Sequence, residues 1–246
     1  MISLEELNEV KEKRKTNLYY EEKEYLQHIF LNALSKFADK FVFKGGTCLR
    51  ICYGLERASE DLDFSTRLDL KEVRKIVSGC LKNFTFLNIN YSIYSEKEYQ
   101  GNLRIEARFE GPLFKGSKAS TNTLKIDFNK GKANHTAAKV IPQLFSDVPA
   151  FTVVALQEEE ILAEKIRALI NRSQPRDLYD IWMLFNKGII LDKTFLLEKL
   201  KEENNRLSDL KIPSKESYQT ELKELLSYLP PYEQVKDYVL GKLSGI

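Results

Sequence analysis

The chain contains few residues that bind soft metals or form covalent cross-links. Its 246 residues include three cysteines (Cys48, Cys52 and Cys80) and two histidines, His28 and His135. A structural zinc site needs a clustered set of such ligands, and the sequence offers none. An odd number of cysteines leaves no complete set of disulfide pairs, as is typical of proteins in the reducing cytoplasm.

Long apolar runs are also absent. No stretch approaches the roughly 18–20 apolar residues that cross a bilayer, and the N-terminal sequence MISLEELNEVKEKRK has no apolar signal core. We therefore expect a cytoplasmic protein without a membrane partner. Hydrophobic residues make up 43% and charged residues 30% of the chain, which indicates a globular protein with one large or two small domains.

The most informative segment is 41–64, FVFKGGTCLRICYGLERASEDLDF. A short apolar strand at 41–43 leads into the turn Gly45-Gly46-Thr47, and a brief helix follows. Glycine permits close approach of the backbone, and such a turn can offer backbone N–H groups to a phosphate. Taken alone, a Gly-Gly turn before a helix is also a common structural feature.

Asp61 and Asp63 follow on a second predicted strand. Side chains two residues apart on a strand point to the same face, roughly 6–7 Å apart. Two such carboxylates repel each other and need a cation or a shared proton. A lone pair of this kind can also lie on a solvent-facing edge. Beside a phosphate-binding turn, however, it indicates metal-assisted chemistry on a nucleotide.

Residue periodicity predicts an α+β protein with a small mixed sheet flanked by helices and a helical C-terminal half. Ser3 and Asp69 are expected to cap helices, and 19–40 has helical spacing. The two predicted domains are 1–156 and 157–246, the second completing the active-site cleft. The predicted strands cover 41–43, 62–65, 84–94, 103–109, 124–128 and 151–156.

Positive charge is concentrated between residues 111 and 140, where six lysines accompany the single acid Asp127. Such a region can contact a phosphate backbone, or it can be a solvated loop. Next to a nucleotide site, a polynucleotide substrate becomes a reasonable expectation. The lysines are Lys115, Lys118, Lys125, Lys130, Lys132 and Lys139.

Two predicted helices in the C-terminal half carry unusual charges. Lys165 falls inside the apolar stripe of 158–172, so its ammonium group must reach the helix edge or meet an anion. In the next helix, Asp177 follows a proline in the first turn, where it can cap free N–H groups. Alternatively, Asp177, Asp180 and Arg176 form a polar network around the lysine.

Taken in order, the motifs GGTCLR, RASEDLDF, LKIDF, LQEEEILAEKIRAL and RDLYDIW resemble the AbiEii/AbiGii toxin family of nucleotidyltransferases, which includes the MenT-type toxins. The resemblance covers about 41–185. The first motif also resembles that of the wider DNA polymerase β-like superfamily. Thr47 stands where that superfamily often has serine, and it keeps the hydroxyl group.

The resemblance implies a metal and phosphate site. Asp61 and Asp63 correspond to the ligands of two Mg²⁺ ions. Asp127 corresponds to a third strand carboxylate that completes the metal site or acts as a general base. Gly45, Gly46 and Thr47 correspond to the phosphate-binding turn of a nucleoside triphosphate site.

Four further roles follow from the resemblance. Ser59 is expected beside the metal site, and Arg57 is expected to reach a phosphate. Lys165 corresponds to the active-site lysine, which also contacts the nucleotide, and Asp177 corresponds to its acidic partner.

The implied activity is transfer of a nucleoside monophosphate to RNA, at the 3′ end of tRNA, within a type IV-like toxin–antitoxin system that includes a cognate antitoxin. Two alternatives remain open: a protein or small-molecule acceptor, and a non-catalytic nucleotide-binding regulatory module. The candidate RNA contacts are Lys115, Lys118, Lys125, Lys130 and Lys132.

Overall fold

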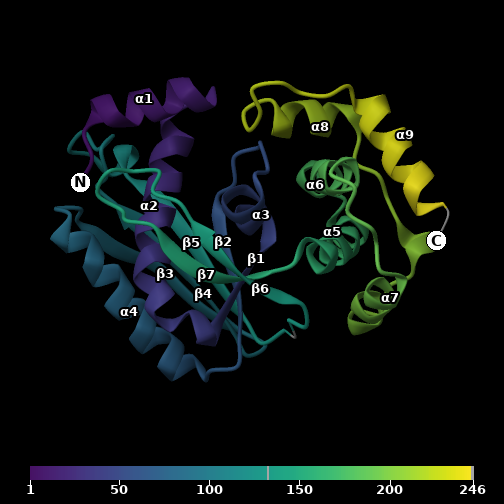
Figure 1. Ribbon diagram of the computed structural model, residues 1–246, viewed down its shortest axis with the longest axis horizontal. Helices are drawn as coiled ribbons and strands as arrows, with labels where there is room; N and C mark the ends of the chain where they lie inside the picture. The colour runs from purple at the N-terminus through teal and green to yellow at the C-terminus, as the bar shows by residue number, and fades with distance from the viewer. Residues whose placement is uncertain (132, 245–246) are drawn as a thin grey trace. The chain divides into compact units, whose positions relative to one another are not determined.

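The computed structural model describes residues 1–131 and 133–244, and the chain divides into two compact units (Figure 1). Unit 1 comprises Met1–Gly54 and Ala58–Leu156. Unit 2 comprises Leu55–Arg57 and the chain from Gln157 onward.

Unit 1 is built on a mixed sheet that, within the described residues, has seven strands in the order β3-β4-β5-β2-β1-β7-β6. The β2–β5 and β1–β7 pairs are parallel, and the other pairs are antiparallel. The strands are β1 (Phe41–Lys44), β2 (Asp61–Thr66), β3 (Tyr91–Tyr99), β4 (Asn102–Phe109), β5 (Asn122–Asn129), β6 (Thr136–Ile141) and β7 (Phe151–Leu156).

Alternation along β2 separates an apolar face from an acidic one. Leu62 and Phe64 are buried, and Phe64 lies 6.4 Å from Phe30 of α2 between ring centroids. Asp61 and Asp63 therefore point to the opposite face. Figure 1 shows α2 and α4 on one face of the sheet and α3 on the other. The helices of unit 1 are α1 (Leu4–Arg14), α2 (Leu18–Leu34), α3 (Gly45–Tyr53) and α4 (Leu70–Phe86), with the 3-10 segments η1 (Ser35–Lys40) and η2 (Lys118–Ser120).

A ladder of phenylalanines fixes the register of the three central strands. Phe43, Phe64 and Phe128 face one another across β1, β2 and β5, and adjacent ring centroids are 5.3 Å apart in stacked geometry. A one-residue slip of any one of these strands would turn its ring toward the acidic face. The ladder therefore determines which residues lie opposite the aspartates.

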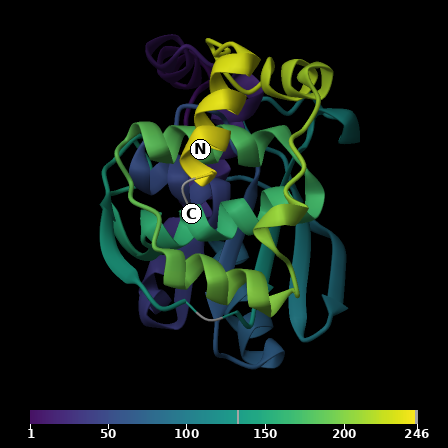
Figure 2. The same ribbon diagram turned by 90° about the vertical axis from the view of Figure 1, so that its right-hand side faces the viewer.

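Unit 2 is helical in its described part, as predicted (Figure 2). Pro175 stands at the start of α6, where its missing N–H group costs nothing and its fixed φ suits a helix. Among the described residues, no helix combines the length and apolar character needed to span a bilayer. The helices are α5 (Glu158–Arg172), α6 (Pro175–Asn186), α7 (Lys193–Glu202), α8 (Lys215–Leu222) and α9 (Tyr232–Leu243), with the 3-10 segment η3 (Leu207–Asp209).

The α+β class, the mixed sheet and the helical C-terminal half are confirmed, and so are both caps: the side chains of Ser3 and Asp69 accept from the first turns of α1 and α4. The strand predicted at 84–94 is wrong in its first half. Phe84 continues the apolar face of α4 and packs 4.4 Å from Phe109 between ring centroids. Strand β6 was missed because only one of its six residues is buried, so this edge strand lacks a clear apolar face.

Candidate active site

Three aspartates lie on neighbouring central strands of unit 1. Asp61 and Asp63 are on β2, and the parallel register places Asp63 opposite Asp127 of β5. Lys125 lies opposite Asp61 in the same strand pair. Directly paired residues share one face of a sheet, so the carboxylates of Asp63 and Asp127 are neighbours.

The electrostatics of this site favour a bound cation. Burial raises the pKa of Asp61; Lys125 opposes this change, while the negative charges of Glu60 and Asp127 add to it. The net result is a pKa for Asp61 above its ordinary value. A raised carboxyl pKa means that the ionised form lacks compensating positive charge, which a divalent cation held by oxygen ligands can supply.

Asp127 is held in place by two residues that the sequence did not single out. Its Oδ1 atom accepts from Arg104 Nε at 2.9 Å and from the Tyr99 hydroxyl at 3.1 Å. Its side chain is only 4% exposed. Within the ranges 1–131 and 133–244, no three His, Cys, Asp or Glu side chains converge as a complete metal-binding group.

The predicted Gly-Gly-Thr turn is the first turn of α3, which begins at Gly45 itself. Gly45 has φ +78°, and a Cβ atom there would lie 2.4 Å from Asp63 Oδ2. The backbone thus approaches the carboxylate as closely as a residue without a side chain permits. The side chain of the N-cap residue Lys44 does not cap this turn. The backbone N–H groups of the turn therefore suit an anion placed beside the aspartates.

Thr47 braces the start of β2. It is fully buried, and its hydroxyl group donates to the carbonyl oxygen of Asp61. The same Oγ1 atom lies 2.9 Å from Ser59 Oγ. The hydroxyl group that threonine shares with serine therefore ties α3 to the chain leading into the aspartates.

Helix α2 contributes two further residues that sequence reasoning missed. Gln27 Nε2 donates to the carbonyl oxygens of Ser59 and Glu60, both at 3.1 Å. The buried Lys23 donates from Nζ to the Thr123 carbonyl at 2.6 Å. Burial lowers the pKa of Lys23. The negative charges of Glu60 and Asp61 act in the opposite direction, but the net pKa is below its ordinary value. The signal was faint, because polar residues on a helix usually face solvent.

Replacing Gly45 with alanine is expected to reduce the activity of this site about 100-fold, because a misplacement of about 1 Å can cost that much. Gly54 is a matched control: its φ is +73°, but a Cβ atom there would have no neighbour within 4 Å. Gly54→Ala should cost about 1 kcal/mol of backbone strain and leave the activity within about twofold. Steady-state rates and thermal unfolding of both variants test this. Equal rates for the two variants would contradict the role of close packing against Asp63.

Unit 2 contains a separate buried ion network. Lys165 Nζ lies 3.0 Å from Asp177 Oδ1 and 2.7 Å from Asp180 Oδ2. Both carboxylates are 0% exposed. Burial lowers the pKa of Lys165, but Asp180 and Asp177 outweigh it and raise the pKa above its ordinary value. Of the two alternatives left open by the sequence, Lys165 meets an anion, and that anion is the protein's own.

Two arginines complete this network. Arg57 donates from Nε and Nη2 to the two carboxylate oxygens of Asp180, at 2.6 and 2.7 Å. Arg172 donates from Nε and Nη2 to the two oxygens of Asp177, at 2.7 and 2.8 Å. The nearby Arg176, expected from the sequence to take part, donates from Nε to Glu221 instead. Such paired contacts are the strongest form of carboxylate recognition.

Acidification is expected to destabilise unit 2 through Asp177. Burial alone raises the pKa of this group, but Lys165 and Arg172 outweigh it and lower the pKa to about 2. The unfolded value is about 3.9, so the stabilisation is fully present above about pH 4 and is lost as the pH falls toward 2. A difference of nearly two pKa units corresponds to about 2.6 kcal/mol. Urea unfolding at several acidic pH values should show a flatter profile for Asp177→Asn; parallel profiles would contradict the assignment.

The candidate RNA contacts in the described residues lie before, within and after β5. Lys115 and Lys118 precede β5, Lys125 lies within it beside Asp61, and Lys130 follows it. Lys132 lies outside the described residues. Lys125 is therefore the candidate nearest to the aspartates by register.

The mixed sheet, with paired aspartates beside a glycine helix start, defines the class of the protein as a nucleotidyltransferase. Residues 29–238 match the family described as nucleotidyl transferase AbiEii toxin of a type IV toxin–antitoxin system, and the chain belongs to this family. The resemblance drawn from the motifs is thereby confirmed. No curated protein matches the sequence.

Solved structures agree on the fold. MenT4, a nucleotidyltransferase toxin from Mycobacterium tuberculosis, is similar with a TM-score of 0.71 and 18% identity, over 98% of this chain and 90% of that one. JHP933 from Helicobacter pylori is similar with a TM-score of 0.58 and 21% identity, over 99% and 92% of the two chains. At these identities the likeness shows the fold alone.

Proposed function

We propose that this nucleotidyltransferase toxin transfers a nucleoside monophosphate from a nucleoside triphosphate to RNA, at the 3′ end of tRNA, and that a cognate antitoxin restrains it. The observation that carries the proposal is the contact between Gly45 and Asp63. It brings the uncapped start of α3, suited to phosphate, against a carboxylate suited to a hard cation.

The aspartates fit a divalent cation in kind, because all their donors are carboxylate oxygens and burial disfavours the ionised form of Asp61 without a cation. We assign Asp61 and Asp63 as the residues that would hold two Mg²⁺ ions, with Asp127 as a third ligand. When bound, Mg²⁺ supplies neutralisation of triphosphate charge and orientation of the α-phosphorus.

The protein's own groups then have distinct tasks. The N–H groups at Gly45, Gly46 and Thr47 bind phosphate oxygens, and the backbone brace from Thr47 to Asp61 keeps the two halves of the site together. The acceptor hydroxyl attacks the α-phosphorus in line; the new P–O bond forms as the bond to the bridging oxygen breaks, and pyrophosphate leaves. If Asp127 is not a ligand, its carboxylate takes the proton from the hydroxyl group.

We further propose, from the family resemblance, that Lys165 is the active-site lysine and Asp177 its partner. The 3.0 Å contact between Lys165 Nζ and Asp177 Oδ1 supports the pairing of these two residues. Arg57 uses Nε and Nη2 for its paired hydrogen bonds to Asp180, and its contact with a phosphate stays a prediction. For Ser59, the hydrogen bond with the Thr47 hydroxyl group supports a structural role beside the proposed metal site.

An RNA acceptor is supported by positive charge next to the aspartates. Lys125 lies opposite Asp61, and Lys23 is close enough to Asp61 and Glu60 for its pKa to respond to them. Lys115, Lys118 and Lys130 extend this charge toward both ends of β5. A polyanionic substrate is attracted to such a distribution.

Labelled nucleoside triphosphates incubated with the protein and either total RNA or protein extract test the acceptor. Label in RNA, with one added base at tRNA 3′ ends after expression, is the expected result. Label found only in protein would show that the acceptor is a protein and not RNA. A growth effect that survives Asp61→Asn in a folded protein would instead support a non-catalytic regulatory module.

A further inference from the structure

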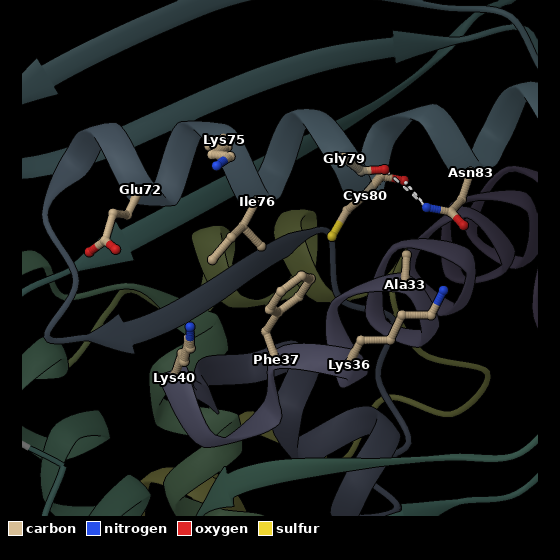
Figure 3. Close-up of a pocket in the computed structure, with 10 residues that line it drawn as sticks. All are labelled: Ala33, Lys36, Phe37, Lys40, Glu72, Lys75, Ile76, Gly79, Cys80 and Asn83. Carbon is tan, nitrogen blue, oxygen red and sulfur yellow. Dashed lines mark hydrogen bonds between the residues drawn. The ribbon is translucent and has the colours of Figure 1, made fainter.

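We propose that a pocket between the α2–η1 segment and α4 binds a small aromatic anion: a molecule with one or two rings and a phosphate or carboxylate group (Figure 3). The pocket belongs to unit 1, and its volume of ≈ 490 Å³ is that of a small-molecule site. It lies on the face covered by α2 and α4, opposite the aspartates. The proposal is therefore independent of the proposed function.

The inner lining suits an aromatic ring. Figure 3 shows the ring of Phe37 directed from η1 toward α4, with Ala33 beside it and Ile76 and Cys80 across from it. The backbone at Phe37 leaves helical geometry (φ −124°, ψ 30°). Burial raises the pKa of the Cys80 thiol to about 12, so this group is an uncharged part of the lining at neutral pH. Flat rings stack well on such surfaces.

The rim of the pocket suits an anion. Lys36 and Lys40 stand on the η1 side and Lys75 on α4, against the single acid Glu72. None of the three lysines forms an ion pair with any described residue of the protein. Lys40 Nζ lies 6.0 Å from the centroid of the Phe37 ring, so one cation already borders the apolar lining. Three lysines without ion pairs around an apolar pocket suit a ligand with a ring and a negative charge.

Gly79 allows the pocket to be blocked without strain. It lines the pocket in the interior of α4, and a Cβ atom there would meet nothing within 4 Å. Tryptophan at this position fills the space and also removes a helix-weakening glycine. The adjacent Ser78 is exposed and does not line the pocket, so Ser78→Trp is a matched control.

The test uses the fluorescent anion 8-anilinonaphthalene-1-sulfonate and its uncharged analogue N-phenyl-1-naphthylamine, titrated into the full chain. We expect saturable binding of the anion at least about tenfold tighter than that of the neutral probe. Gly79→Trp should weaken anion binding about tenfold or more, and Ser78→Trp should leave it within about twofold. Unchanged binding to Gly79→Trp would overturn the proposal.

A second variant tests the charge even if Gly79→Trp fails to fold. Reversal of two exposed lysines, Lys36→Glu with Lys75→Glu, should abolish the preference for the anion over the neutral probe; a retained preference would overturn the proposal.

Competition with adenosine monophosphate and with naphthalene-1-acetate shows whether the site prefers a phosphate or a carboxylate group on the ligand. Displacement by either supports the site, and displacement by neither refutes it. Repeating the titration with Asp61→Asn separates this result from any failure of nucleotidyl transfer.

Discussion

Replacing Asp61 or Asp63 with asparagine is expected to lower nucleotidyl transfer by about 10²- to 10³-fold, the largest effect on activity that any single change should have. Loss of one charged group that stabilises a transition state costs about 3–4 kcal/mol, and each 1.36 kcal/mol is a factor of about ten in rate. Asparagine keeps the shape of the side chain and removes its charge, so the loss reports on charge. Transfer of labelled nucleotide to RNA is the measurement.

The same substitution should have the opposite effect on stability without metal. The pKa of Asp61 is raised by burial and by the neighbouring Glu60 and Asp127, so its ionised form is unfavourable in the folded protein. Asp61→Asn should therefore unfold at the same or a higher temperature than the wild type. Added Mg²⁺ should stabilise the wild type by about 2.7 kcal/mol at 100 times its dissociation constant and should not stabilise the variant.

Asp69→Asn is the matched control, since it makes the same chemical change in the same unit. Asp69 caps α4 through its side chain, and asparagine caps helices about equally well. Transfer and stability should both stay close to the wild type. Activity retained in Asp61→Asn and Asp63→Asn, with Asp69→Asn as reference, would contradict the assignment of the site.

The acidic half of the site could be predicted because it is local in sequence. Alternation along β2 is enough to place Asp61 and Asp63 on one face, and the preceding glycines mark the helix start. The pairing of Asp63 with Asp127 joins strands far apart in the chain. Register of this kind depends on the phenylalanine ladder and cannot be read from either strand alone.

The residues that support the site could not be predicted for a related reason. Lys23 and Gln27 lie on a helix rich in charge, and Arg104 lies on the polar side of an alternating strand. On sequence alone each is a solvent-facing residue. Each gained its role from a partner at least 23 residues away, as in the Arg104–Asp127 contact.

The unusual position of Lys165 in the sequence predicted only part of the buried ion network. Its position within an apolar stripe indicates either a snorkelling side chain or an anionic partner. The anions are Asp177 and Asp180, on the next helix. Arg57, which also belongs to this network, is 123 residues from Asp180 in the sequence, and no local pattern connects the two.

Removing Asp180 is expected to have the largest effect on stability. Asp180→Ala would leave Arg57 and Lys165 buried without the carboxylate that contacts both. Breaking a buried ion pair by removing one partner costs about 3–5 kcal/mol, because the charge that remains is still buried but has lost that partner. Trp182, the only tryptophan in the chain, is on α6 with Asp180. Its fluorescence during urea unfolding therefore reports on unit 2.

Two comparisons separate buried charge from simple loss of an ion pair. Arg172→Ala removes a partner of Asp177 whose side chain is 51% exposed, and it should cost less than about 1 kcal/mol. Replacing Arg57, Lys165 and Asp180 together by apolar residues of similar size should recover much of the loss, because no unpaired charge remains. A midpoint for Asp180→Ala equal to that of Arg172→Ala would show that the network contributes little. A large loss restored by the triple replacement would show that unpaired charge in unit 2 is the cause.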